Sequence, residues 1–149
     1  MLETGIKGRQ EVVVSDANSA KTMGSGTLDV FATPAMTALM EKTAWMSVAD
    51  QLDEGCGTVG TLLNVTHDAP TPLGMTVWCE TELVEVDGRR LVFDVAAYDA
   101  KGKIGASLSK TRSFRRKRIR RLSSNFSSAR LKYAIHFYHP LELPAGWYF

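Results

Sequence analysis

The chain has 149 residues, of which 44% are hydrophobic and 23% are charged, as expected for one soluble globular domain with a buried core. No apolar run approaches the roughly 18 residues of a membrane-spanning helix, and M-L-E-T-G-I-K-G-R-Q is not a signal sequence, so we expect a cytoplasmic protein. The net charge of +2 conceals an uneven distribution. Residues 1–105 contain 8 Lys/Arg and 15 Asp/Glu, whereas residues 106–149 contain 10 Lys/Arg and one acidic residue. The composition therefore predicts a domain over 1–105, followed by an atypical basic and aromatic tail over 106–149.

The N-terminal part of the chain predicts one strand, a polar loop and one long helix. Residues 9–15 have strand character, and a polar stretch through K-T-M-G-S-G follows them. Thr33 is suited to cap the helix and Pro34 to occupy its first turn. We expect the helix to end near Leu52. Apolar and small residues repeat at helical spacing at Met36, Leu39, Met40, Thr43, Ala44 and Ser47.

Glu41 and Lys42 are the only charged residues between positions 34 and 49, so the helix is apolar on almost every side and should be buried. A carboxylate in such a helix costs free energy unless it is paired or used in chemistry. Lys42 is adjacent in sequence and points away on a helix, which makes it a poor ion-pair partner. Glu41 is therefore a candidate general base, with an ion pair to a cation of a second chain as the alternative.

The remainder of the domain predicts a run of antiparallel strands. The expected strands are residues 58–67, 75–86 and 90–99, and Ile104-Gly105 opens a last one. Asp87-Gly88 is a strong two-residue hairpin signal between the second and third of these strands. Alternation in the first strand predicts one face made of Val59, Thr61, Leu63, Val65 and His67. This order is an α+β plan, and an antiparallel sheet wrapped around one central helix is the hot-dog fold.

Several blocks of this chain resemble one family. They are T-M-G-S-G-T-L-D-V-F-A-T-P-A-M-T-A-L-M-E, T-V-G-T-L-L-N-V-T-H-D-A-P-T-P-L-G-M-T-V, E-L-V-E-V-D-G-R-R-L-V-F-D-V and A-Y-D-A-K-G-K-I-G. Together they resemble thioesterase-like hot-dog proteins related to fluoroacetyl-CoA thioesterase, over about residues 9–105. The resemblance implies a hot-dog homodimer that hydrolyses a small acyl-CoA thioester.

The resemblance also assigns roles to residues at matching positions. Thr33 corresponds to the active-site threonine of the family, Glu41 to its glutamate and His67 to its histidine. Gly60 corresponds to the glycine that lies against the acyl group of the substrate. Phe31 lies close to these positions in sequence and is a candidate substrate-binding aromatic residue, with a core position as the alternative.

A hydroxyl, a carboxylate and an imidazole are the minimum set for acyl transfer. Glu41 would activate water, or attack the thioester to form an anhydride, while backbone N–H groups at the helix N-terminus polarise the carbonyl. Thr33 would position water, hold the glutamate, attack the thioester or only cap the helix. His67 would exchange a proton with the leaving thiolate or orient Glu41, the alternative being an ordinary polar strand end.

The sequence departs from the family after Gly105. Relatives usually continue with G-T-H-x-R-F, whereas this chain reads G-A-S-L-S-K-T-R-S-F, which lacks the histidine. Arg112 would match the arginine of the family only with a shift of one residue, so we assign it no role. We therefore predict that residues 106–149 replace the expected last strand, which in this fold lies inside the sheet.

The tail leaves several functions open. Segment 110–121 has eight Lys/Arg and no acidic residue, and residues 106–149 contain 8 of the 13 aromatic residues. Nucleic-acid binding through this segment, contact with a membrane surface or partner, and the product of a shifted reading frame are three interpretations, of which we favour the last. The alternatives to a thioesterase are a non-catalytic acyl-CoA-binding hot-dog module and a nucleic-acid-associated protein.

The two cysteines, Cys56 and Cys79, lack metal-ligand spacing, so we expect neither a metal nor a cofactor. Cys79 falls inside a strand pattern and should belong to the core. Cys56 falls in the predicted loop E-G-C-G, where it is a weaker candidate nucleophile.

Overall fold

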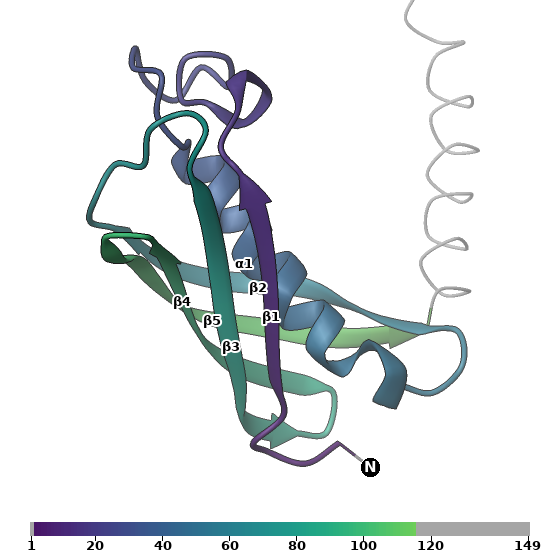
Figure 1. Ribbon diagram of the computed structural model, residues 1–149. Coiled ribbons are helices and arrows are strands. Elements are labelled where there is room, and N and C mark those ends of the chain that lie inside the picture. Colours follow the sequence, from purple (N-terminus) through teal and green to yellow (C-terminus); the bar gives the residue numbers. More distant parts are fainter. Residues whose placement is uncertain (1, 116–149) are drawn as a thin grey trace, which may run out of the picture. The chain divides into compact units, whose positions relative to one another are not determined.

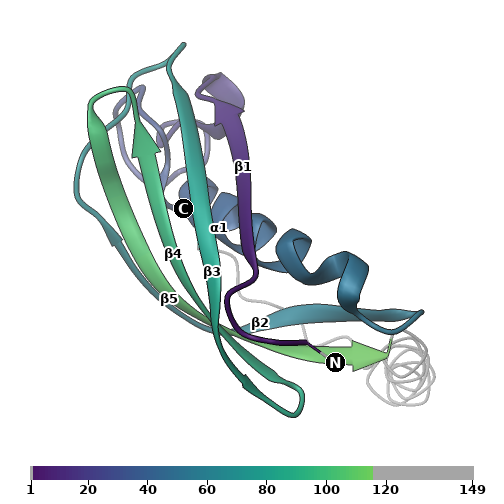
Figure 2. The same cartoon turned by 60° about the horizontal axis from the view of Figure 1, so that its bottom comes forward.

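One long helix, α1 (Thr33–Val48), packs against a five-stranded antiparallel sheet with the strand order β1-β3-β4-β5-β2 (Figure 1). The computed structural model describes residues 2–115. The strands are β1 (Lys7–Val13), β2 (Cys56–His67), β3 (Thr76–Asp87), β4 (Arg90–Asp99) and β5 (Gly102–Arg115). Short 3-10 turns, η1 (Asp16–Asn18) and η2 (Ala49–Gln51), follow β1 and α1. The sheet curves around α1, which confirms the predicted α+β hot-dog arrangement (Figure 2).

The hairpin between β3 and β4 forms at Asp87 and Gly88, as predicted. Gly88 has a φ of 56°, a left-handed conformation that glycine adopts without a steric penalty. The strands pair from Asp87 and Arg90 through to Trp78 and Tyr98, so the two-residue turn sets the register next to the hairpin, and the register shifts between Leu83 and Glu85.

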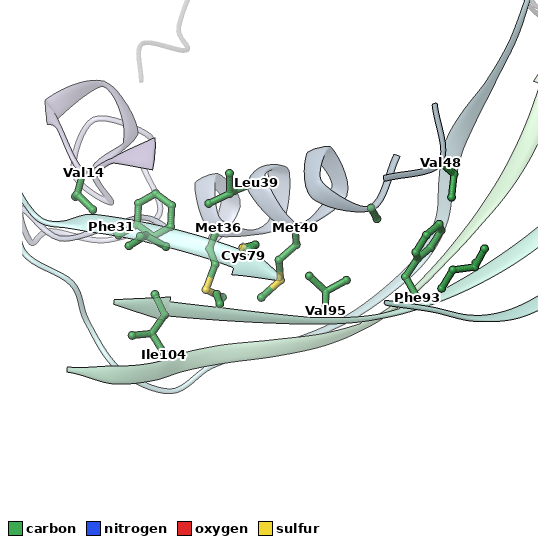
Figure 3. Packing of buried hydrophobic residues seen from close by; sticks show 14 of the residues in the cluster. Val14, Phe31, Met36, Leu39, Met40, Val48, Cys79, Phe93, Val95 and Ile104 are labelled. Carbon is green, nitrogen blue, oxygen red and sulfur yellow. The ribbon is translucent and has the colours of Figure 1, made fainter. Parts of the chain in front are cut away.

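The core lies between α1 and the concave face of the sheet. Figure 3 shows Met36 and Met40 extending from α1 toward the strands, where Phe93, Val95 and Ile104 lie. The buried residues of the helix are Met36, Leu39, Met40, Thr43, Ala44 and Val48. No helix in the described part of the chain is long and apolar enough to cross a membrane.

The expectation that α1 is buried on every side is wrong. Trp45 is 45% exposed and Met46 is 39% exposed, although both lie within the helix. A single sheet covers only one face of a helix, so the remaining apolar side chains stay uncovered by the described residues of one chain.

The predicted common face of β2 is also wrong, because the strand contains a bulge. The register between β2 and β5 shifts between Gly60 and Leu62. An extra residue in one strand moves the side chains that follow it to the opposite face. Leu63, Val65 and His67 therefore alternate on the inner face, whereas Val59 is 47% exposed.

The last strand is present, so the boundary that we predicted after residue 105 lies too early. β5 continues to Arg115 and pairs with β2 on one side and β4 on the other. In A-S-L-S-K-T-R-S-F, small hydroxyl residues alternate with longer ones, and this period of two suits a strand whose inner face lies beneath a helix. Of the predicted tail, residues 116–149 lie outside the described residues, as does the second half of the basic segment 110–121.

Truncation tests the contribution of β5. A chain that ends at residue 105 should not fold, because β2 and β4 would both lose their partner, and a domain of this size has only about 5–15 kcal/mol of net stability. A chain that ends at residue 115 keeps all five strands and should unfold cooperatively in urea. Cooperative unfolding of the 1–105 chain, followed by circular dichroism, would contradict the assignment.

Candidate active site

Thr33 and His67 form the first part of the candidate site. Thr33 is the first residue of α1 and His67 is the last residue of β2, so the packing of the helix on the strand brings the two together. Thr33 Oγ1 lies 2.8 Å from His67 Nδ1, which is a hydrogen bond. The direction of the bond follows the imidazole tautomer: when Nδ1 carries no proton, the hydroxyl donates to it.

The predicted capping role of Thr33 is wrong. The cap position is Ala32, and no side chain makes a capping hydrogen bond there. Thr33 already has helical backbone conformation, and Pro34 follows it in the first turn. The hydroxyl of Thr33 therefore bonds to His67 instead of to the backbone N–H groups of its own helix.

The environment of His67 favours a neutral imidazole. Burial lowers the pKa of His67 below its ordinary value of 6.5, and the backbone of Ala69 and the charge of Asp68 offset part of this effect. The Nε2 atom is buried and has no hydrogen-bond partner among the described residues. A neutral imidazole at pH 7 is able to accept a hydrogen bond from the Thr33 hydroxyl, which a protonated one is not.

A cavity of about 450 Å³ opens beside Thr33 and His67. Its wall combines the loop that precedes α1 with the segment that follows β2. The loop contributes Ala20, Ser25, Gly26, Thr27, Leu28, Val30 and Phe31, and the segment contributes Asp68, Ala69 and Pro70. Phe31 is only 2% exposed, so it belongs to the core and also borders the cavity.

Glu41 and Gly60 form a second group, farther along α1. Glu41 is half-buried, and its carboxylate lies directly over Gly60 of β2. A Cβ atom at position 60 would overlap Glu41 Oε1 and would lie 3.3 Å from Glu41 Cδ, so only glycine leaves room for this carboxylate. Glu41 forms no ion pair with another described residue, Lys42 included.

A second, smaller cavity of about 290 Å³ surrounds this carboxylate. The residues that line it are Ala38, Glu41, Lys42, Trp45, Thr58, Gly60 and Thr111. Thr33 and Glu41 are eight positions apart, or about 12 Å along the helix axis, and they border different cavities. The fold thus pairs Thr33 with His67 and Glu41 with Gly60, but it does not unite the two pairs within one chain.

Thr111 is a site residue that the sequence analysis missed. Its hydroxyl is buried without a hydrogen-bond partner among the described residues, and the side chain borders the Glu41 cavity. The signal in the sequence was the alternation of Ser and Thr after Gly105, which we had interpreted as a departure from the family. The neighbouring Arg112 is exposed and, since successive residues alternate across a strand, belongs to the opposite face of the sheet.

Neither cysteine lines either cavity. Cys79 is fully buried, as predicted, and burial raises the pKa of its thiol to about 12, so it is not a nucleophile at neutral pH. Cys56 is half-buried and begins β2, although we had expected it in a loop. Within residues 2–115 no cluster of His, Cys, Asp or Glu could hold a metal ion.

Comparison with known proteins identifies the class. The family model for fluoroacetyl-CoA-specific thioesterase matches residues 14–111, which includes most of β5. The fluoroacetyl-CoA thioesterase of Streptantibioticus cattleyicolor is 45% identical over 78 residues, or 52% of this chain. That match spans 56% of the length of this curated relative.

Two solved structures share the fold. A mutant of the fluoroacetyl-CoA-specific thioesterase FlK, in complex with fluoroacetate and CoA, superposes with a TM-score of 0.75 and 31% identity, over 79% of this chain and 99% of that one. A hot-dog-like protein from Thermanaerovibrio acidaminovorans superposes with a TM-score of 0.74 and 23% identity, over 83% of this chain and 92% of that one. The fold and the matching family model thus define a hot-dog protein of the thioesterase class. More narrowly, the chain belongs to the fluoroacetyl-CoA-specific thioesterase family.

Titration of His67 by NMR tests the described environment. The His67 ring in the folded protein should titrate with a midpoint below 6.5, because burial disfavours the charged imidazolium. The neutral form, and with it the bond from the Thr33 hydroxyl, is lost as the pH falls through that midpoint. The signal is assigned with the His67→Gln variant, and the urea-unfolded chain serves as the control with a midpoint near 6.5. A folded-state midpoint at or above 6.5 would contradict this environment.

Proposed function

We propose that this protein is a thioesterase that hydrolyses a small acyl-CoA, with Glu41 as general base or nucleophile and with Thr33 and His67 assisting. The observation that carries the proposal is the 2.8 Å hydrogen bond between Thr33 Oγ1 and His67 Nδ1 in a cavity at the N-terminus of α1. The names of the family and of its curated relative, a fluoroacetyl-CoA thioesterase, support the same chemistry.

The N-terminus of α1 supplies the electrostatic part of the mechanism. Backbone N–H groups of the first helical turn have no partner within the helix and concentrate positive charge there. A thioester carbonyl placed beside Thr33 would be polarised by these groups, which stabilise the negative charge that develops on its oxygen during attack. His67 holds the Thr33 hydroxyl at this position through their hydrogen bond.

Glu41 supplies the base or the nucleophile. In the first route, water attacks the carbonyl carbon, Glu41 takes one proton from the water, and the C–S bond breaks to release the CoA thiolate. In the second route, a Glu41 oxygen attacks the carbonyl carbon and displaces the thiolate, and water then hydrolyses the resulting anhydride. Both routes yield the free acid and CoA, and both require the carboxylate at position 41.

A homodimer would bring the two groups of residues together. β2 is an edge strand, and Val59 and Leu62 of β2 and Trp45 of α1 are exposed. Leu63 and Asn64 lie midway between Gly60 and His67 along β2. If two copies of β2 pair antiparallel about Leu63 and Asn64, Gly60 of one copy comes close to the partner's His67. Each site would then combine Glu41 of one subunit with Thr33 and His67 of the other.

Thiol release from a panel of short acyl-CoAs tests the function. Wild type should release CoA, and Glu41→Gln should lower kcat by roughly 100-fold or more, because an amide cannot accept the proton. The matched control is Glu54→Gln, which removes an exposed carboxylate six residues after the end of α1 and should leave kcat unchanged.

Each result has a clear meaning. Full activity of Glu41→Gln would exclude both routes through Glu41. A folded wild type that binds acyl-CoA without turnover would point to the non-catalytic binding module instead. The acyl-CoA that is hydrolysed fastest in the panel would define the substrate of this protein. The substrate in the name of the relative describes that relative alone.

A further inference from the structure

The inner face of β5 carries three buried hydroxyl groups in a row. Ser107, Ser109 and Thr111 are 6%, 0% and 3% exposed, and the side-chain oxygen of each has no hydrogen-bond partner among the described residues. A buried hydroxyl without a partner costs free energy, so an unpartnered oxygen in a folded protein calls for a bound water or ligand as an explanation.

Thr111 differs from the two serines in its surroundings. Ser107 pairs with Val65 and Val95, and Ser109 pairs with Leu63 and Phe93, so apolar residues flank both of them. Thr111 pairs with Leu91 on one side and with Gly60 on the other, and it borders the cavity that contains the Glu41 carboxylate. Of the three residues, Thr111 is therefore the one that lines the same cavity as the Glu41 carboxylate.

Thr111 and Glu41 both lie beside Gly60 and line the same cavity. Glu41 Oε1 would overlap a Cβ atom at position 60, the direct strand partner of Thr111. No direct hydrogen bond joins Thr111 Oγ1 to Glu41. A water between two such oxygens would make a hydrogen bond to each.

We propose that Thr111 Oγ1 and the Glu41 carboxylate together bind the water that attacks the thioester. The water donates one hydrogen bond to Glu41 and the other to Thr111, which leaves a lone pair of its oxygen free for the carbonyl carbon. As the new C–O bond forms, Glu41 takes the first proton and the C–S bond breaks to release the CoA thiolate. This inference rests on the proposed thioesterase function and selects the water route over the anhydride route.

Substitution at position 111 tests the role of the hydroxyl. Thr111→Val keeps the shape and the branched side chain that a strand favours but removes the oxygen, and it should lower kcat about 10-fold or more with KM changed less than about 2-fold. Thr111→Ser keeps the oxygen and should restore most of kcat. Ser109→Ala removes a buried hydroxyl with apolar neighbours only, and it should leave kcat unchanged.

Isotope labelling of the product tests the role of water independently of folding. In a single turnover of the wild-type enzyme in H₂¹⁸O, direct attack by water places ¹⁸O in the acid that is released. The anhydride route can instead leave ¹⁸O in the Glu41 carboxylate, which mass spectrometry of the peptide detects. Label on Glu41 with an unlabelled product would overturn the proposal, even if Thr111→Val failed to fold.

The failures of this inference and of the proposed function are distinguishable. If wild type releases no thiol, or if Glu41→Gln is fully active, both are overturned. If Glu41→Gln is inactive and Thr111→Val has the kcat of wild type, only the role of Thr111 is overturned. A loss of kcat in Ser109→Ala equal to that in Thr111→Val would also overturn it, since the effect would then follow from any lost hydroxyl of β5.

Discussion

The contact between α1 and the edge strand β2 is the constraint on which the site depends. At one end, Thr33 reaches His67 because the helix begins where the strand ends. Farther along, Glu41 fits against the strand only because Gly60 has no side chain. The same contact leaves Trp45 and Val59 exposed. One packing arrangement thus positions both groups of candidate residues and leaves apolar side chains exposed.

The sequence predicted the main elements because their patterns are local. The α1 helix, the Asp87-Gly88 hairpin and the strands before and after it follow from periodicity and turn chemistry. The errors arose where contacts between distant parts of the chain determine the local structure. The bulge after Gly60 depends on pairing with β5, and the inner strand β5 itself was missed because its Ser and Thr residues give a weak hydrophobic signal. The exposure of one face of α1 likewise depends on which other elements of the fold pack against the helix.

The candidate site was predicted only in part. A family resemblance pointed to Thr33, Glu41, His67 and Gly60, and the fold gives each of them a polar or steric partner. Spacing along the chain could not reveal that the two pairs occupy separate cavities, since that separation follows from the path of β2 beneath the helix. Thr111 was missed for a different reason: its position matters only through its pairing with Gly60.

The central claim is that a complete site combines Glu41 of one subunit with Thr33 and His67 of another. Mixing the two inactive variants Glu41→Gln and His67→Ala, after joint unfolding and refolding, tests it most directly. Half of the dimers should be mixed, and each should contain one intact site, so the mixture should recover about a quarter of wild-type thiol release. Recovery of no activity, although mixed dimers form, would contradict the shared site, because each chain would then need its own Glu41 and His67.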